Sequence, residues 1–260
     1  MERPRTVVIT GASMGIGAQM AEVLAAQSTD LVLVARSEDR LEAMAVRLRK
    51  LHNISVRVEP TDLTAPDSTV KLFDRLQVDG VIVDGLINNA GMGSNGRFWE
   101  QPRQRELQQI QLNVAALTSL CHLFVPQMVE RGFGRILNIA STAGFQPGPH
   151  MAVYFATKAY VISFTQALGH ELRGTGVTAT AHCPGATHSN FAQTAGNDHT
   201  LLFALSPACP KEVATHAISA MNHGLPLSVH GWINRAGVFA LRLAPRWLIR
   251  TLAARLNLPK

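Results

Sequence analysis

Three polar residues in the middle of the chain have the types and spacing needed to transfer a proton to a carbonyl oxygen. Tyr154 and Lys158 are four residues apart, so on a helix they share one face. A tyrosine hydroxyl has a pKa of about 10, and a neighbouring ammonium group would lower that pKa. Ser141, 13 residues before Tyr154, can donate to the same substrate oxygen. For the tyrosine and lysine taken alone, a half-buried helix tyrosine is the alternative explanation.

Two further residues near this set have two explanations each. Asn113 lies inside a long predicted helix, where asparagine is mildly unfavourable. It either holds an ordered water behind Lys158 that resupplies protons, or makes a structural hydrogen bond. His150 lies shortly before Tyr154 and either touches the substrate or is an exposed loop histidine.

A glycine-rich turn follows a β-branched run near the N-terminus and begins a helical one, with the sequence Thr10-Gly11-Ala12-Ser13-Met14-Gly15-Ile16-Gly17. Gly11 permits a tight turn, Gly15 lets the backbone approach a pyrophosphate, and Gly17 lets the helix pack close to the sheet. The helix N-terminus then offers free N–H groups to phosphates, and we expect Ser13 and Ile16 to take part. A plain strand-to-helix loop is the alternative, but a strand before and a helix after are the context that a dinucleotide site requires.

The end of the second predicted strand indicates which dinucleotide binds. An acidic residue there would bind the ribose of NAD, but this chain has Arg36, which can make a forked contact with the 2′-phosphate of NADP. Ser13 and Arg40 can contribute, and the alternative is that Arg36 is a solvated residue at a strand end. Asp62, with Leu63 beside it, either accepts a hydrogen bond from the adenine or caps the following helix. We therefore expect NADP(H) as the cofactor.

Short β-branched runs alternate with longer helical patterns, which is typical of βαβ units. The predicted strands are Thr6–Thr10, Leu31–Ala35, Ser55–Glu59, Val81–Val83 with Leu86–Ile87, Arg135–Ala140 and Val177–His182. The predicted helices are Gly15–Gln27, Glu38–Lys50, Pro66–Leu76 with Pro66 in its first turn, Gln104–Arg131 and Ala152–Arg173. We predict one doubly wound α/β domain over residues 1–260, with a parallel sheet covered by helices on both faces. Ligands of such sheets bind beyond the carboxyl ends of the strands, where the candidate site residues fall.

Composition and cysteine usage narrow the class of protein. Apolar residues make up 47% and charged residues 16%, which supports a sizeable core. The cysteines, Cys121, Cys183 and Cys209, are far apart, which predicts reduced thiols and neither a disulfide frame nor a metal site. A strand begins within a few residues of the N-terminus, so we expect no signal peptide, and no apolar run approaches the ~20 residues of a membrane span. These features predict a cytoplasmic protein.

The net charge of +6 belongs to the C-terminal segment 231–260. That segment has six cations and no acidic residue, whereas the first 230 residues carry 18 cations and 18 acidic residues, so we expect no nucleic-acid-binding face. Aromatic and aliphatic residues lie between the arginines, and Pro245 predicts a break between two basic amphipathic helices. Three roles are open for these helices: weak contact with an anionic membrane, packing on a neighbouring subunit, or closing over the substrate pocket. The simplest explanation of their composition is an arginine-rich solvated face on a packed helix.

As an ordered set, these residues resemble the short-chain dehydrogenase/reductase family over roughly residues 5–190. The matching positions are Thr10–Gly17, Asp62, Asn88–Gly91, Asn113, Ser141, Tyr154, Lys158 and Pro184–Gly185. The resemblance implies a Rossmann-type sheet of about seven strands, with Tyr154 as catalytic acid/base, Lys158 and Ser141 as its partners, and Asn113 in a proton relay. It also implies two groups of cofactor contacts, Asn89, Ala90 and Gly91 on the adenine-ribose side and Pro184, Gly185 and Thr187 beside the nicotinamide. Family members commonly form dimers or tetramers through the two long helices, so we expect a homodimer or homotetramer.

The chain departs from the family pattern after Thr187. Residues 190–210 are the predicted substrate lid, and their apolar residues either favour an apolar substrate or form the buried side of a lid helix; these residues are Phe191, Leu201, Leu202, Phe203 and Leu205. We predict an NADP(H)-dependent oxidoreductase that interconverts a carbonyl group and a secondary alcohol, with Tyr154 as acid/base. Two alternatives stay open: a non-catalytic cofactor-binding scaffold or redox sensor, and a membrane-associated interaction module.

Overall fold

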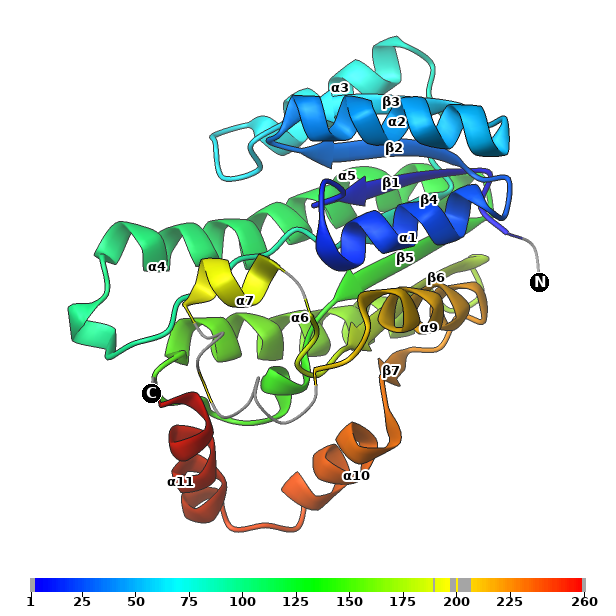
Figure 1. The fold of residues 1–260 in the computed structure, drawn as a ribbon. Helices are drawn as coiled ribbons and strands as arrows, with labels where there is room; N and C mark the ends of the chain where they lie inside the picture. The colour runs from blue at the N-terminus through cyan, green and yellow to red at the C-terminus, as the bar shows by residue number, and fades with distance from the viewer. Residues whose placement is uncertain (1–2, 189, 197–199, 201–206, 259–260) are drawn as a thin grey trace.

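The computed structural model describes residues 3–188, 190–196, 200 and 207–258. Within them the chain forms a seven-stranded sheet in the order β3-β2-β1-β4-β5-β6-β7, and every neighbouring pair is parallel. The strands are β1 (Thr6–Thr10), β2 (Asp30–Ala35), β3 (Val56–Pro60), β4 (Gly85–Asn88), β5 (Gly134–Ile139), β6 (Val177–Cys183) and β7 (Leu227–Val229). The predicted doubly wound α/β sheet is therefore confirmed (Figure 1).

Helices cover both faces of the sheet, and each face buries its own hydrophobic core (Figure 1). One core is formed with α1 (Gly15–Ala25), α2 (Glu38–His52) and α9 (Pro210–Asn222). The other is formed with α3 (Ser68–Val78), α5 (Leu117–Glu130) and α6 (Ala152–Glu171). Because both faces are covered, a central strand such as β1 is apolar at consecutive positions and does not alternate.

The winding of the sheet reverses at β1, which pairs with β2 on one side and with β4 on the other. In such sheets a crevice opens beyond the carboxyl ends of the two strands at the reversal. Thr10 ties these ends together, because its Oγ1 donates to Ile87 O (3.3 Å) and accepts from the N–H groups of Asn89 and Ala90 (both 3.0 Å). The loops after β1 and β4 are thus held side by side at the crevice.

The first long helix is continuous but not uniform. It runs from α4 (Arg103–Ile110) through a π-helical turn (Gln111–Ala116) into α5. The helix Arg103–Glu130 is long and apolar enough to cross a membrane by length and composition, with a mean hydropathy of 1.4 in its most apolar 18-residue window, although the sequence predicted no such segment. Phe124 and Met128 of this helix are buried in the core against the sheet, so its role as a core helix explains its apolar composition.

Most element boundaries lie within two residues of the predictions, and three differences are informative. Pro66 does not lie in the first turn of α3, since that helix begins at Ser68 after Asp67 in the left-handed conformation. The predicted strand Val81–Val83 is wrong: the chain there is still turning back from α3, with Val81 N bonded to Leu76 O, and β4 begins at Gly85. The edge strand β7 is three residues long, too short to leave a periodic signal in the sequence.

After β7 the chain leaves the sheet and forms α10 (Trp232–Leu241) and α11 (Arg246–Asn257). Pro245 lies between them, which confirms the predicted break. Figure 1 shows the two helices below the sheet, joined by a loop at the edge of the molecule. The predicted lid contributes the short helix α7 (Asn190–Ala195), whereas four of its apolar residues lie outside the described residues, namely Leu201, Leu202, Phe203 and Leu205.

Candidate active site

A cavity of about 460 Å³ lies beyond the carboxyl ends of the strands. The loops after β1 to β6 form its walls together with α7 and α11. Most predicted site residues line it, namely Gly11, Ser13, Gly15, Ile16, Arg36, Asp62, Leu63, Asn89, Ala90, Gly91, Ser141, Tyr154, Lys158, Pro184, Gly185 and Thr187. The sequence therefore predicted the place where these segments meet. Gly17 and Asn113 lie outside the cavity lining.

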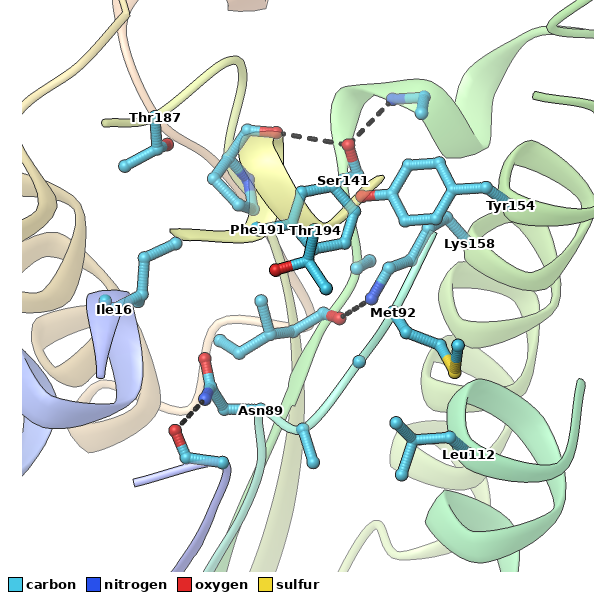
Figure 2. A pocket seen from close by; sticks show the side chains of 18 of the residues that line it. Ile16, Asn89, Met92, Leu112, Ser141, Tyr154, Lys158, Thr187, Phe191 and Thr194 are labelled. Carbon is cyan, nitrogen blue, oxygen red and sulfur yellow. Dashed lines mark hydrogen bonds between the residues drawn. The ribbon is translucent and has the colours of Figure 1, made fainter. Parts of the chain in front are cut away.

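The glycine turn has the backbone geometry that its sequence predicts. Gly11 and Gly15 have φ values of 67° and 59°, in the region that side chains other than hydrogen disfavour. A Cβ at Gly17 would collide with the carbonyl oxygen of Gly11 and approach Asn89 Nδ2. Asn89 Nδ2 in turn donates to the carbonyls of Thr10 (3.0 Å) and Gly11 (3.2 Å), as the close view in Figure 2 helps to follow. Gly17 is therefore a packing residue of the turn, and it does not contact the cavity.

Arg36 and Asp62 lie at the far end of the cavity from Tyr154, on the loops after β2 and β3. Asp62 Oδ1 accepts from the backbone N (2.9 Å) and the hydroxyl (2.7 Å) of Thr64, so it stabilises a local turn. The interpretation of Asp62 as a helix cap is wrong, because α3 begins only after Asp67. Burial raises the pKa of Asp62, but the hydrogen bonds from Thr64 and the charge of Arg36 outweigh that effect and lower it. The carboxylate is ionised and faces a cation; Arg40 is not part of the lining.

Ser141 and Tyr154 place two hydroxyl groups together at the reacting end (Figure 2). Ser141 caps the short 3-10 turn that follows β5, where its Oγ accepts from Ala143 N (3.1 Å) and lies 3.5 Å from the carbonyl oxygen of Pro184. Tyr154 comes from the first turn of α6, and the ring of Phe191 packs against it with 5.2 Å between ring centroids. The hydroxyl pair therefore sits between the β5 loop, the β6 loop and α7.

Lys158 lies one turn after Tyr154 on α6 and is buried. Its Nζ donates to the carbonyl oxygen of Ile139 (2.7 Å) and lies 5.8 Å from the centroid of the Tyr154 ring. Burial lowers the pKa of Lys158 to about 8. A Cβ at Gly91 would lie 3.6 Å from this Nζ, an ordinary contact distance, so the ammonium group lies directly beside the β4 loop.

The pKa of Tyr154 shifts in the direction opposite to the one predicted from Lys158. Burial raises it to about 12, and the hydrogen bond with Ser141 offsets only part of that effect. The physical reason is that Lys158 directs its charge at the Ile139 carbonyl, whereas the phenol lies in a dry environment that disfavours its anion. In the protein alone, Tyr154 is therefore held in its protonated form.

Asn113 lies in the π-helical turn, and its side chain makes three hydrogen bonds within the protein. Its Nδ2 donates to Met92 O (2.9 Å) and to Thr157 Oγ1 (3.0 Å), and its Oδ1 accepts from Met92 N (3.0 Å). These bonds tie the first long helix to the β4 loop and to α6. The geometry supports the structural explanation of this residue; the proton relay stays a prediction.

The substrate end of the cavity is uncharged and mostly apolar. Among the described lining residues, Arg36, Asp62 and Lys158 carry charge. Arg36 and Asp62 lie at the nucleotide end, and Lys158 lies beside Tyr154. Met151, Phe155 and Phe191 form an apolar cluster with Tyr154, and Ala253 and Leu256 of α11 also line the cavity. Phe191 was predicted to belong to the lid, and it does face the cavity (Figure 2).

Helix α11 closes this end, which was one of three alternatives for the basic tail. Ala253, Leu256 and Asn257 line the cavity. Asn257 is buried; its Nδ2 donates to Pro149 O (3.1 Å) and its carbonyl accepts from Asn95 Nδ2 (2.9 Å). Sequence reasoning missed these residues individually, because an asparagine at the end of an apolar helix carries no motif. His150 is not part of the lining; it has a φ of 67° in the loop before α6, as expected for a loop residue.

Comparisons with known proteins agree with this fold. The family model for short chain dehydrogenases matches residues 5–200. A ketoacyl reductase of Nostoc sp. is 35% identical over 220 residues, which cover 84% of this chain and 76% of the relative. The structure of a short-chain dehydrogenase from Sphingobium yanoikuyae in complex with NADPH has a TM-score of 0.82 at 36% identity and covers 92% of this chain and 93% of that one. The bulky-bulky ketone specific alcohol dehydrogenase from Comamonas testosteroni has a TM-score of 0.78 at 32% identity over 92% of both chains.

The parallel sheet, the glycine turn at its reversal point and the serine, tyrosine and lysine beyond it define a Rossmann-type oxidoreductase. The family model covers most of the chain, and the relatives extend over nearly its whole length. The chain belongs to the short-chain dehydrogenase family, as the resemblance of its motifs implied.

Proposed function

We propose that the protein is an NADP(H)-dependent carbonyl reductase, which interconverts a carbonyl group and a secondary alcohol. The observation that carries this proposal is one cavity with Ser141, Tyr154 and Lys158 at one end and the glycine turn with Arg36 at the other. The relatives and solved structures include a ketoacyl reductase, an NADPH complex and a ketone-specific alcohol dehydrogenase, which supports the same class of reaction.

The residues at the far end of the cavity fit a phosphorylated dinucleotide. The positive φ values of Gly11 and Gly15 open the N-terminus of α1, and its first turn has no acidic residue to repel a pyrophosphate. Arg36 takes the position at the end of β2 where an acidic residue would bind an unphosphorylated ribose. Arg36 would hold the 2′-phosphate, and NADPH bound in this way would supply the hydride.

The chain supplies the proton from the Tyr154 hydroxyl. This hydroxyl is protonated at neutral pH, since burial raises its pKa to about 12. Ser141 Oγ lies beside it and hydrogen-bonds the same substrate oxygen, which holds that oxygen in place as negative charge develops. Lys158 is still mostly protonated at neutral pH with a pKa of about 8; in the proposed reaction its Nζ turns from the Ile139 carbonyl toward the phenolate that forms when the proton leaves, and its charge then stabilises that anion.

The lining of the substrate end favours a neutral and largely apolar carbonyl compound. A substrate with a charged group close to its carbonyl would find no ion-pair partner there, because the charged lining residues other than Lys158 belong to the nucleotide end. Phe191 and Leu256 give a wall on which a bulky hydrocarbon substituent can pack.

A panel of neutral ketones and charged keto acids, followed by the absorbance of NADPH with NADH in parallel, tests this proposal. We expect oxidation of NADPH with apolar ketones, much slower oxidation of NADH, and little turnover of charged keto acids. If NADPH binds but no carbonyl compound is reduced, and no alcohol is oxidised with NADP, a non-catalytic scaffold or redox sensor replaces this proposal.

We also propose that copies of the chain associate through the two long helices. The outward faces of these helices carry partly exposed apolar residues within the described chain, namely Leu107, Ile110, Val129 and Tyr160. Light scattering after gel filtration is expected to give the mass of a dimer or tetramer, and a monomer at all concentrations would contradict this assembly.

A further inference from the structure

Helix α10 turns an apolar stripe to solvent. Trp232 and Phe239 are 78% and 63% exposed and lie two turns apart on one face, and Leu243, which is 77% exposed, extends the stripe into the loop after α10. The helix itself buries none of its residues. In a soluble domain the apolar stripe of a helix normally faces the core, so this surface has the composition of one that a partner covers.

Helix α11, which follows α10 after a short loop, also carries exposed apolar residues. Trp247 is exposed on the side of α11 opposite to its buried Ile249 and Ala253, and Leu252 is half exposed at the flank of that buried side. Figure 1 shows that the two helices meet at the edge of the molecule, away from the sheet. We call this the C-terminal surface, and its apolar members are Trp232, Ile233, Phe239, Leu243, Trp247 and Leu252.

The cations of the chain's basic segment lie on the same two helices. Their arginines are Arg235, Arg242, Arg246, Arg250 and Arg255, and residues 231–260 contain no acidic residue. Arg242 and Arg246 flank the loop between the helices and are exposed, and within the described part of the chain neither makes an ion pair. The surface therefore presents aromatic and aliphatic side chains among uncompensated positive charges.

We propose that the C-terminal surface docks the protein on an anionic lipid bilayer. Tryptophan, phenylalanine and leucine on one face with arginines beside them are the composition of helices that lie in the headgroup region, where each arginine gains from negative lipid charge. A second copy of the chain fits this surface less well. A two-fold interface brings a patch against itself, and here it would set arginines against arginines with no acidic residue to separate them.

Docking in this orientation would bring the substrate end of the cavity close to the bilayer. Leu256 and Asn257 of α11 line the cavity, while Trp247 and Leu252 of the same helix belong to the C-terminal surface. The docking itself does not depend on the reaction that the cavity performs, so it is tested without a substrate.

Sedimentation of the full-length protein with vesicles tests the proposal. Vesicles of phosphatidylcholine alone are compared with vesicles that also contain phosphatidylserine, at low and high salt. We expect co-sedimentation with the anionic vesicles alone, weakened by salt. The double variants Phe239→Ala/Trp247→Ala and Arg242→Glu/Arg246→Glu are each expected to bind at least about tenfold more weakly.

Matched substitutions elsewhere on the surface separate docking from general changes in charge or hydrophobicity. Lys50→Glu/Lys71→Glu changes the net charge by the same amount on α2 and α3, and Val46→Ala/Val78→Ala removes exposed apolar groups there. Both controls are expected to bind vesicles like the unaltered protein. All four variants are expected to keep the far-UV circular dichroism and NADPH binding of the unaltered protein, since none of the substituted residues lines the cavity.

Three outcomes would overturn the proposal. The first is equal sedimentation with and without anionic lipid, and the second is unchanged vesicle binding in both double variants. The third is a lower oligomeric mass of the Phe239→Ala/Trp247→Ala variant by light scattering, together with no vesicle binding by any form, which would assign the surface to a second copy of the chain.

Discussion

The glycine turn and helix α11 bound the same cavity from opposite ends. The wall at the glycine turn is made of backbone atoms, and the wall at α11 is made of side chains. At the glycine turn the wall is backbone, held by the Asn89 side chain and packed so closely that Gly17 has no room for a Cβ. At α11 the wall consists of side chains such as Leu256, with Asn257 fixed by two hydrogen bonds to distant loops.

This difference determines how freely the sequence can vary at each end of the cavity. A backbone wall depends on the absence of side chains at fixed positions, so its sequence is a motif with fixed spacing. A side-chain wall needs only the right volume and polarity, and many sequences supply these. The nucleotide end therefore sets the cofactor, whereas substitutions in α11 can alter selectivity without disturbing cofactor binding.

The largest effect is expected at Tyr154, at the reacting end of the cavity. Tyr154→Phe removes the proton donor and is expected to lower turnover by roughly 10²–10⁴-fold while the Kd for NADPH stays nearly unchanged. The chain's other tyrosine is a matched control on the same helix: Tyr160 is partly exposed, and its hydroxyl pairs with Thr118 at 2.9 Å. Tyr160→Phe is expected to keep full turnover. Steady-state kinetics and fluorescence titration measure both, and equal turnover of the two variants would remove Tyr154 from the mechanism.

Arg36→Ala tests the cofactor end next. A hydrogen bond to a charged group is worth about 1.5–3 kcal/mol, so the Kd for NADPH is expected to rise by roughly 10- to 150-fold. The Kd for NADH, which lacks the 2′-phosphate, is expected to stay constant and serves as the internal control. Calorimetric titration with both nucleotides measures the ratio, and a parallel loss of both affinities would place Arg36 outside the phosphate contact.

Two glycine-to-alanine substitutions compare the backbone-built end with the C-terminal helices. Gly17→Ala inserts a Cβ against the Gly11 carbonyl and is expected to lower the free energy of unfolding by about 1–3 kcal/mol and to weaken NADPH binding. Gly237 in α10 has open space around it, so Gly237→Ala is expected to raise the helix stability by up to about 1 kcal/mol and to leave NADPH binding unchanged. Urea unfolding distinguishes the two, and a neutral Gly17→Ala would contradict the close packing of the turn.

The smallest effect is expected at the side-chain wall. Leu256→Ala enlarges the substrate end and is expected to change the ratio of kcat/KM between a bulky and a small ketone by roughly tenfold, with NADPH binding unaltered. Trp247→Ala, on the exposed side of the same helix opposite to Leu256, is the control and is expected to leave that ratio unchanged. If both variants behave alike toward dissolved ketones, α11 does not select the substrate.

The same contrast explains how much could be predicted from the sequence. The glycine turn, Ser141, Tyr154 and Lys158 were predicted to meet in one place because their types, order and position after strands are restricted by geometry. Leu256 and Asn257 were not identified, since apolar volume and one buried amide leave no spacing to recognise. The predicted direction of the Tyr154 pKa shift was wrong for a related reason. The burial of the phenol and the hydrogen bond from Lys158 to the Ile139 carbonyl both depend on packing, and the spacing of two residues carries no information about packing.

In the proposed reaction, hydride passes within this cavity from NADPH to a carbonyl carbon. The most direct test follows the atom itself, with NADPH deuterated at C4 and an apolar ketone that the protein reduces. We expect the deuterium on the carbinol carbon of the alcohol, with one stereochemistry at C4 of the cofactor, and a solvent proton on the oxygen. Deuterium that stays on the oxidised cofactor with either C4 label, or that is released to water, would contradict direct hydride transfer.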